Sequence, residues 1–440
     1  MEKHISLQVK ITDNKYFMNT ATETILDNGL KFIHIDMPQA LTATVLVLVA
    51  TGSEYETKEN NGISHFLEHM CFKGTEKRPT VKIISSELDA MGSLSNAFTG
   101  QEYTGYYAKA DAARFAGILD VIADIYQHAT LPDVELQKEK GVIIEEINMY
   151  EDMPKHLVQE VFSGLLYGDT PAGRRVLGPK ENILRFTRED FITYRKAHYV
   201  PNATTVIVAG NVPKATALTA ITDTFGKTTR GEKSIKVPVV DSQTTPAILL
   251  QEKATDQAHF VLGIRTINAH DPRNPIASVL GSVLSGGMSS RLFQKLREEM
   301  GVCYYVQAYH DTYTDHGFFE VAAGVDTKRM LEVVGVVRDE LVRLKNELVG
   351  DEELAKVKAY ITGNFKMNLE STDAVAEFYG NRAVLGKPLE SPEQAVAKIN
   401  AVTAEEIKEF AKTFFVTETM NLAAISRHTD PAPFAKILSM

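Results

Sequence analysis

The most informative stretch of this 440-residue sequence reads Gly62-Ile63-Ser64-His65-Phe66-Leu67-Glu68-His69-Met70-Cys71-Phe72-Lys73-Gly74-Thr75. The glycines at its two ends predict a helix of roughly three turns between them. Residues four apart lie on one face of a helix, so His65 and His69 can bind the same metal ion. Glu68 lies on the same side and can reach a metal-activated water without being a ligand. The order His-x-x-Glu-His is the reverse of the zincin motif.

Chance is the alternative explanation of this pattern, because the chain has twelve histidines. The apolar neighbours Ile63, Phe66, Leu67 and Met70 predict that the helix is largely buried. Two histidines and a glutamate on a buried helix need polar partners or a metal ion. We therefore prefer the metal-site interpretation.

A catalytic zinc ion usually takes three protein ligands, so a carboxylate is expected beside the two histidines. The best candidates lie in a second predicted helix, Glu139-Lys140-Gly141-Val142-Ile143-Ile144-Glu145-Glu146-Ile147. Glu139 and Glu146 share one face, about 10 Å apart along the axis, whereas Glu145 points about 100° away. The residues alone do not choose between Glu145 and Glu146, and both could be ordinary surface carboxylates.

Five blocks of the first half recur in the same order in the second half, 209 to 218 residues later. Residues 63–74 correspond to 276–287, and residues 136–149 correspond to 354–367. This repetition predicts an internal duplication with domains at 1–227 and 247–440, joined by a polar linker at 228–246. The mixture of strands and long helices predicts an α+β fold, in which each domain is a largely antiparallel sheet packed with helices.

Composition excludes several classes of protein. The net charge of −10 disfavours nucleic acid as a partner, because phosphate binding needs a basic face. No apolar run reaches the roughly 18 residues of a membrane helix, so no membrane association is expected. Two cysteines cannot form a disulfide framework, and the N-terminus lacks the features of a secretory signal. A cytoplasmic location is therefore expected.

The stretch 62–75 resembles the M16 (pitrilysin/insulinase) family of zinc metallopeptidases, and especially its short-chain members related to the mitochondrial processing peptidase. The resemblance implies one Zn²⁺ per chain, with Glu68 as general base and no covalent intermediate. The family places its third ligand after 76 intervening residues, which is the position of Glu146. A second family glutamate, seven residues earlier, corresponds to Glu139. The resemblance therefore favours His65, His69 and Glu146 as ligands, with Glu139 as their support.

The segment 95–104 resembles the family's substrate-binding edge strand, and implies that Ser95, Asn96, Ala97 and Phe98 contact the substrate. Such a strand pairs with an extended peptide through backbone hydrogen bonds. Without the resemblance, this segment predicts a plain strand followed by a glycine turn. The implied substrates are peptides or unfolded segments that bind as an added β-strand.

The resemblance also implies that Arg297 and Tyr304, seven residues apart in the second half, hold substrate near the zinc. The second half has no metal ligands of its own, because the positions equivalent to the first-half residues carry Ser278, Gly281, Ser282, Val357 and Asn364. It is expected to bind and enclose substrate rather than to form a second active site.

Longer family members hold four such domains around a closed chamber, with the metal site and the Arg–Tyr pair in different domains. A chain with two domains and both sets of residues therefore suggests a homodimer in which each subunit completes the other's site. The alternatives are the catalytic subunit of a hetero-oligomeric processing peptidase and a non-catalytic scaffold relative. The intact His65, Glu68, His69 and Glu146 set argues against the scaffold. The presence of Arg297 and Tyr304 argues against the hetero-oligomer.

Overall fold

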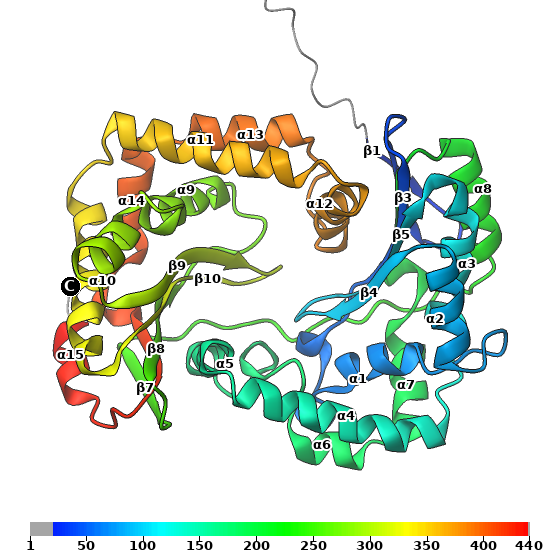
Figure 1. The fold of residues 1–440 in the computed structure, drawn as a ribbon, viewed down its shortest axis with the longest axis horizontal. Helices are drawn as coiled ribbons and strands as arrows, with labels where there is room; N and C mark the ends of the chain where they lie inside the picture. The colour runs from blue at the N-terminus through cyan, green and yellow to red at the C-terminus, as the bar shows by residue number, and fades with distance from the viewer. Residues whose placement is uncertain (1–20, 439–440) are drawn as a thin grey trace, which may run out of the picture.

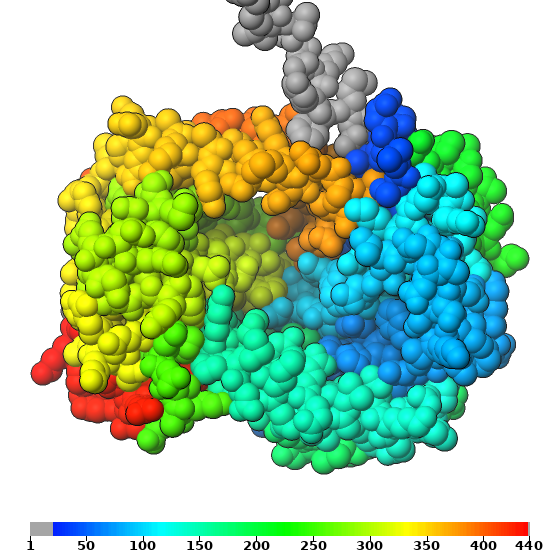
Figure 2. Space-filling view, in the orientation of Figure 1, coloured from blue at the N-terminus to red at the C-terminus, as the bar shows by residue number. Residues whose placement is uncertain are grey.

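The structure, a computed structural model, describes residues 21–438. It has two halves, each built on one sheet, and Figure 2 shows that the molecule is hollowed between them. The N-terminal extension at 1–18, whose role the sequence does not predict, lies outside the described residues. Among those residues, we find no helix with the length and apolar character needed to cross a bilayer.

The first sheet has six strands in the order β1-β2-β6-β3-β5-β4. All neighbours are antiparallel except β2 and β6. The strands are β1 (Ala21–Ile25), β2 (Lys31–Asp36), β3 (Thr42–Val49), β4 (Leu94–Thr99), β5 (Thr104–Asp111) and β6 (Thr204–Gly210). Strand β4 therefore forms one edge of this sheet.

The second sheet has the order β7-β11-β8-β10-β9, and only β7 and β11 are parallel. Its strands are β7 (Ala247–Glu252), β8 (Gln257–Arg265), β9 (Cys303–Thr312), β10 (Gly317–Asp326) and β11 (Asn421–Ser426). This order repeats β2-β6-β3-β5-β4 strand for strand, including the position of the parallel pair. The predicted α+β fold with a duplicated, largely antiparallel architecture is therefore confirmed.

The helices of the first half are α1 (Ile63–Cys71), α2 (Val81–Ala90), α3 (Phe115–His128), α4 (Asp133–Glu151), α5 (Pro154–Tyr167), α6 (Lys180–Arg185), α7 (Arg188–His198) and α8 (Lys214–Phe225). Those of the second half are α9 (Asn274–Ser285), α10 (Met330–Asn346), α11 (Asp351–Asn368), α12 (Thr372–Val384), α13 (Pro392–Ala401), α14 (Ala404–Phe414) and α15 (Ala432–Ile437). Helices α1, α3, α7 and α8 form one core with a face of the first sheet.

Each half contributes one helix to the core of the other half's sheet. Helix α12 of the second half packs against β3 and β6 of the first sheet, where Tyr379 and Val375 meet Leu46, Leu48 and Ile207. Helix α5 of the first half packs in the same way against β8 and β11 of the second sheet. The two helices begin at equivalent positions, because residues 154 and 372 differ by 218. Each sheet therefore depends on the other half for part of its core.

The segment between the halves, residues 226–246, contains no helix or strand. Its Lys236 is buried, and its ammonium contacts Glu54 at 2.5 Å, Glu102 at 2.6 Å and Asp315 at 2.6 Å. Because Asp315 lies in the second half, this lysine joins the linker to both halves. The domain limits at 227 and 247 stay a prediction.

Candidate metal centre

Helix α1 begins at a glycine for a steric reason. Gly62 has φ +101°, and a side chain there would place a Cβ 2.5 Å from the carbonyl oxygen of Leu177. The buried carboxylate of Glu56 accepts hydrogen bonds of 2.8 Å from the backbone N–H groups of Gly62 and Ser64. These contacts satisfy two of the unpaired N–H groups at the helix start. They fix the position of the helix that carries both histidines.

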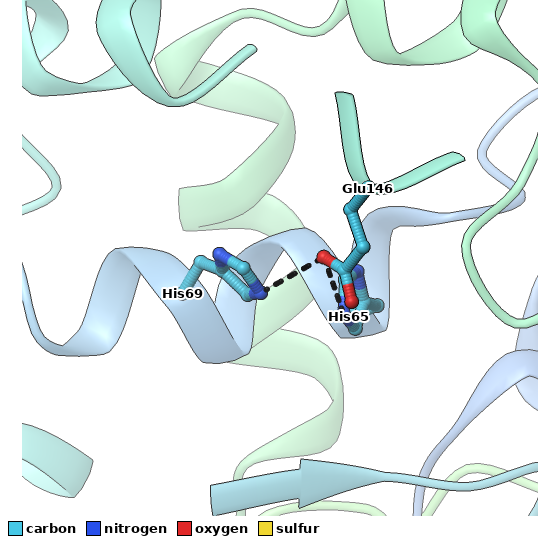
Figure 3. Close-up of side chains that lie close together, drawn as sticks. All are labelled: His65, His69 and Glu146. Carbon is cyan, nitrogen blue, oxygen red and sulfur yellow. Dashed lines mark ion pairs between the residues drawn. The ribbon is translucent and has the colours of Figure 1, made fainter. Parts of the chain in front are cut away.

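Three ligand-type side chains converge between α1 and α4. The Nε2 atoms of His65 and His69 each lie 3.7 Å from one carboxylate oxygen of Glu146 (Figure 3). One ligand atom from each residue lies within 4.8 Å of the other two. Tetrahedral zinc bonds of about 2.1 Å would bring such atoms to roughly 3.4 Å from one another, so only a small contraction is needed. Glu145 is exposed and contacts Asn148 instead.

Glu139 orients His69. The Nδ1–H group of His69 donates to Glu139 at 2.8 Å, and the ammonium of Lys73 lies 2.5 Å from the other Glu139 oxygen. With its proton on Nδ1, His69 directs the Nε2 lone pair toward Glu146. Burial alone would raise the pKa of Glu139, but the hydrogen bonds from His69 and Lys73 hold it below its usual value.

The protonation states also fit a metal ion. Burial, helped by the charge of His69, lowers the pKa of His65 to about 3, so its imidazole is neutral. Burial lowers the pKa of His69, but Glu139 and the nearby carboxylates raise it overall. Burial raises the pKa of Glu146. Without a metal ion, the raised pKa values of His69 and Glu146 favour a proton at this cluster. Two imidazole nitrogens and a carboxylate are suitable ligands for zinc, whose binding would displace that proton.

Glu68 lies beside this cluster but belongs to a different contact. Its buried carboxylate accepts a hydrogen bond of 2.6 Å from the hydroxyl of Thr99, the last residue of β4. Burial raises the pKa of Glu68, and the hydrogen bond from Thr99 partly opposes this effect. A carboxylate with a raised pKa is suited to accept a proton near neutral pH.

The predicted substrate-contacting residues Ser95, Asn96, Ala97 and Phe98 all lie on β4. This strand pairs with β5 only, and its other edge has no strand partner among residues 21–438. Ser95 and Asn96 are exposed, whereas Ala97 and Phe98 are half-buried. The backbone of β4 can therefore accept a further strand beside Glu68.

Arg297 and Tyr304 lie in the second half, where Tyr304 belongs to β9, and Figure 1 shows β9 apart from α1. Arg297 is on the helical segment Phe293–Glu299, and its Nη1 donates to the backbone carbonyl of Tyr304 at 3.2 Å. The Tyr304 side chain is 66% exposed. Within the part of the chain that the structure describes, no hydrogen bond or ion pair joins either residue to the histidine cluster.

The sequence analysis missed two polar residues at this site, Lys73 and Thr99. Lys73 carried a usable signal, because it stands four residues after His69 in the stretch predicted to be helical, although α1 itself ends at Cys71. Thr99 carried none, because its contact with Glu68 spans 31 residues and depends on how β4 packs beside α1.

A second group of possible ligands, Glu54, Asp315 and His316, lies between the halves. The ammonium of Lys236 already contacts Glu54 and Asp315 there. Within residues 21–438, the His65–His69–Glu146 cluster is therefore the group that best suits a metal ion.

Two family models match most of the chain. Residues 31–180 match the family described as insulinase (peptidase family M16), and residues 185–361 match the peptidase M16 inactive domain. The chain belongs to peptidase family M16. The inactive-domain match covers part of the half that lacks the metal ligands.

Relatives of this M16 chain include an uncharacterized zinc protease of Bacillus subtilis, which is 35% identical over 91% of this chain and 96% of its own length. An uncharacterized zinc protease of Rickettsia felis is 33% identical over 90% of this chain and 95% of its length. A Helicobacter pylori protease structure superposes with a TM-score of 0.87 at 21% identity, covering 93% of this chain and all of that one. A putative M16-like peptidase from Alicyclobacillus acidocaldarius gives 0.80 at 18% identity, with coverages of 92% and 98%. The solved structures support the fold.

Proposed function

We propose that this M16 chain is a zinc-dependent endopeptidase that cleaves peptides or unfolded segments. The observation that carries the proposal is the convergence of His65, His69 and Glu146 beside a buried glutamate, Glu68, at the end of an open edge strand. Metal ligands, a proton acceptor and a peptide-binding edge are the parts that metal-assisted peptide hydrolysis needs.

His65, His69 and Glu146 would hold one zinc ion per chain, and Glu139 would keep His69 in its ligating orientation through the Nδ1 hydrogen bond. When bound, zinc supplies Lewis acidity, which activates a water molecule and polarises the scissile carbonyl. Lys73 stabilises the ionised form of Glu139 and so supports the same arrangement.

Glu68 acts as general base in this proposal. It accepts a proton from the attacking water and returns it to the leaving amine nitrogen. Its burial and its bond to Thr99 fix the carboxylate in position before substrate arrives. No side chain becomes acylated, since water is the nucleophile.

Substrate would bind as an extended strand along β4, with its backbone paired to that of Ser95, Asn96, Ala97 and Phe98. Backbone pairing gives affinity with little sequence preference. Because Thr99 ends β4 and contacts Glu68, a peptide on this strand passes the proton acceptor directly. This arrangement favours unfolded chains over folded proteins.

Arg297 and Tyr304 would act across a homodimer, where Tyr304 donates a hydrogen bond to the developing oxyanion and Arg297 holds substrate. Support comes from the exposure of both side chains and from their position in the half that lacks the cluster. Two hollowed chains facing one another would enclose a chamber, and each chain would complete the other's site.

Cleavage of a quenched, unstructured peptide by the purified chain tests the proposal. We expect cleavage with zinc, loss with chelator, and loss in Glu68→Gln with about one zinc ion still bound. Glu145→Gln, a carboxylate exposed on α4, is the matched control and should keep wild-type activity. Zinc-loaded chain that cleaves nothing, or a Glu68→Gln variant that cleaves normally, would contradict the proposal.

A further inference from the structure

A separate hollow of about 600 Å³ lies on the first half, between α3, α7 and the loop that follows α3. It belongs to the helix-covered side of the first sheet, opposite the face that α12 covers. It shares no residue with the metal-ligand cluster or with β4. The hollow is therefore a site distinct from the proposed active site.

Three cationic side chains of α7 line this hollow: Arg188, Arg195 and Lys196. None of them forms an ion pair with a carboxylate within residues 21–438, and Glu76 is the acidic residue that lines the hollow with them. A concave surface with an excess of unpaired positive charge attracts an anion.

Both arginines donate to backbone carbonyls at the end of α3 or in the loop that follows it, and both keep unused N–H donors. Arg188 donates to the backbone carbonyls of Leu131 at 2.9 Å and Thr130 at 3.0 Å. Arg195 donates to the carbonyls of Ala129 at 2.8 Å and Tyr126 at 2.9 Å. A guanidinium group has five N–H donors, so each arginine keeps donors for a ligand. The carbonyl contacts also restrict the rotamers of the two side chains, which lowers the entropy cost of binding.

The rest of the lining is mainly apolar and aromatic. Leu30, Ile192 and Phe225 contribute apolar surface. Tyr126 and Tyr199 also line the hollow, and their rings stack at 5.2 Å between centroids. Apolar walls with a few convergent polar groups are typical of a site for a small organic molecule.

The loop beneath the hollow, residues 129–132, runs from α3 into α4 and contacts the residues that follow α1. Ala129 forms a β-bridge with Thr75, and the N–H and hydroxyl groups of Thr130 both donate to the carbonyl of Gly74, just after α1. Leu131 has φ +51°, a strained value for a side-chain-bearing residue, and α4 starts two residues later. A ligand that shifts this loop therefore acts on α1 and α4 together.

We propose that this hollow binds a small organic anion, with its charged group on Arg188, Arg195 and Lys196 and its apolar body on the Tyr126–Tyr199 side. Occupancy is transmitted through residues 129–132 to α1 and α4. The charge excess selects the anion, and the apolar lining selects a ligand that also has a ring or alkyl body. The carbonyl contacts of the arginines couple the ligand to the loop.

Calorimetric titration of the full chain with 1-naphthyl phosphate tests the binding site, with inorganic phosphate and 1-naphthol as the two separated parts. We expect one molecule per chain, bound at least tenfold more tightly than either part. Lys196→Glu, which reverses an exposed charge without a described partner, should weaken binding at least tenfold, and Lys196→Arg should restore it. Lys214→Glu, on α8 outside the hollow, is the control and should bind normally. Equal binding to Lys196→Glu and wild type, or no saturable binding, would overturn the proposal.

Hydrogen exchange tests the coupling without any assay of peptidase activity. The probe should slow amide exchange several-fold at residues 129–131 and at 73–75, in wild type but not in Lys196→Glu. Protection confined to α7 would overturn the transmission step. Because both measurements are independent of cleavage, their failure is distinguishable from failure of the proposed peptidase function.

Discussion

The hydroxyl of Thr99 donates a 2.6 Å hydrogen bond to the carboxylate of Glu68, and so joins the end of an open edge strand to α1, the helix of His65 and His69. Burial is the main influence on the pKa of Glu68 and raises it, whereas this bond lowers it. The threonine therefore controls how readily the proposed base ionises.

Thr99→Val should raise the pKa of Glu68, because the ionised carboxylate loses a donor. Since the base works only when ionised, activity is lost as pH falls through this pKa. The acid limb of a kcat/KM profile should therefore move to higher pH, by about one unit for a bond worth roughly 1.5 kcal/mol. Thr99→Ser keeps the hydroxyl and should keep the profile. An equal displacement in both variants would show that the hydrogen bond is not responsible.

Glu139→Gln should weaken zinc binding by about 10–100-fold, the usual cost of losing a carboxylate that orients a ligating histidine. Competition with a chromogenic chelator measures this. Lys73→Met should cause a smaller loss, because Glu139 stays in place. Glu135→Gln, on the same helix and ion-paired with Lys138, is the control. A comparable loss in that control would point to damage of α4 rather than to the His69 contact.

Glu146→Gln should abolish stoichiometric zinc after dialysis and lower cleavage by more than about 100-fold, beyond the effect expected of an orienting residue. A neutral amide is a poor zinc ligand compared with a carboxylate. The neighbouring Glu145→Gln should keep one zinc per chain. Retention of zinc by Glu146→Gln would require a different third ligand. Metal content by atomic absorption distinguishes these outcomes.

Mixing inactive Glu68→Gln chains with inactive Arg297→Ala chains should restore activity if subunits share sites. In a randomly mixed population about half of the dimers are heterodimers. Each heterodimer has one of its two sites built from a wild-type Glu68 and a wild-type Arg297, so recovery of about a quarter of wild-type activity is expected. Analytical ultracentrifugation of the same samples reports the oligomer. No recovery from chains that demonstrably exchange subunits would reject the shared site.

Glu320 on β10 gives a prediction for stability. Burial raises its pKa from the ordinary 4.5 to about 7, so between these pH values the folded chain holds a proton that the unfolded chain has lost. Stability should therefore fall as pH rises from about 4.5 through 7. Glu320→Gln should reduce this slope. It should also raise the free energy of unfolding at pH 8 by up to about 3 kcal/mol, because a rise in pKa from 4.5 to about 7 corresponds to that much free energy.

Urea unfolding at pH 5 and pH 8 measures the effect of Glu320→Gln. Part of the slope should persist, since burial also raises the pKa of Glu54 to about 7. Glu332→Gln, at an exposed surface position, should leave the slope unchanged. An unchanged slope in Glu320→Gln would mean that this carboxyl ionises normally in the folded chain.

Local spacing was enough to predict the cluster's first two members. His65 and His69 are one helical turn apart, and their apolar neighbours showed that the helix is buried. The choice between Glu145 and Glu146 was different, because it depends on how α4 is rotated against α1. Only the resemblance to the family favoured Glu146 from the sequence. In the structure Glu146 lies 3.7 Å from each histidine while Glu145 is exposed, and the role of Glu146 as ligand stays a prediction.

Long-range packing was beyond the sequence analysis. The repeated blocks predicted two equivalent halves, and the strand order of the sheets confirms this. No local pattern showed that α5 and α12 would cross to the other half, because an apolar helix face does not specify which sheet covers it. The Thr99–Glu68 contact was unpredictable for the same reason.

The reciprocal placement of α5 and α12 gives the second half a structural role, because α12 completes the core behind the first sheet. Without α12, the first sheet would expose Leu46, Leu48 and Ile207 to water, and the scaffold behind the metal helix would lose part of its support. The second sheet depends in the same way on α5, which covers Val261, Ala423 and Ile425. Either half made alone would therefore leave one apolar sheet face open to solvent, so the chain should not divide into two independently stable fragments.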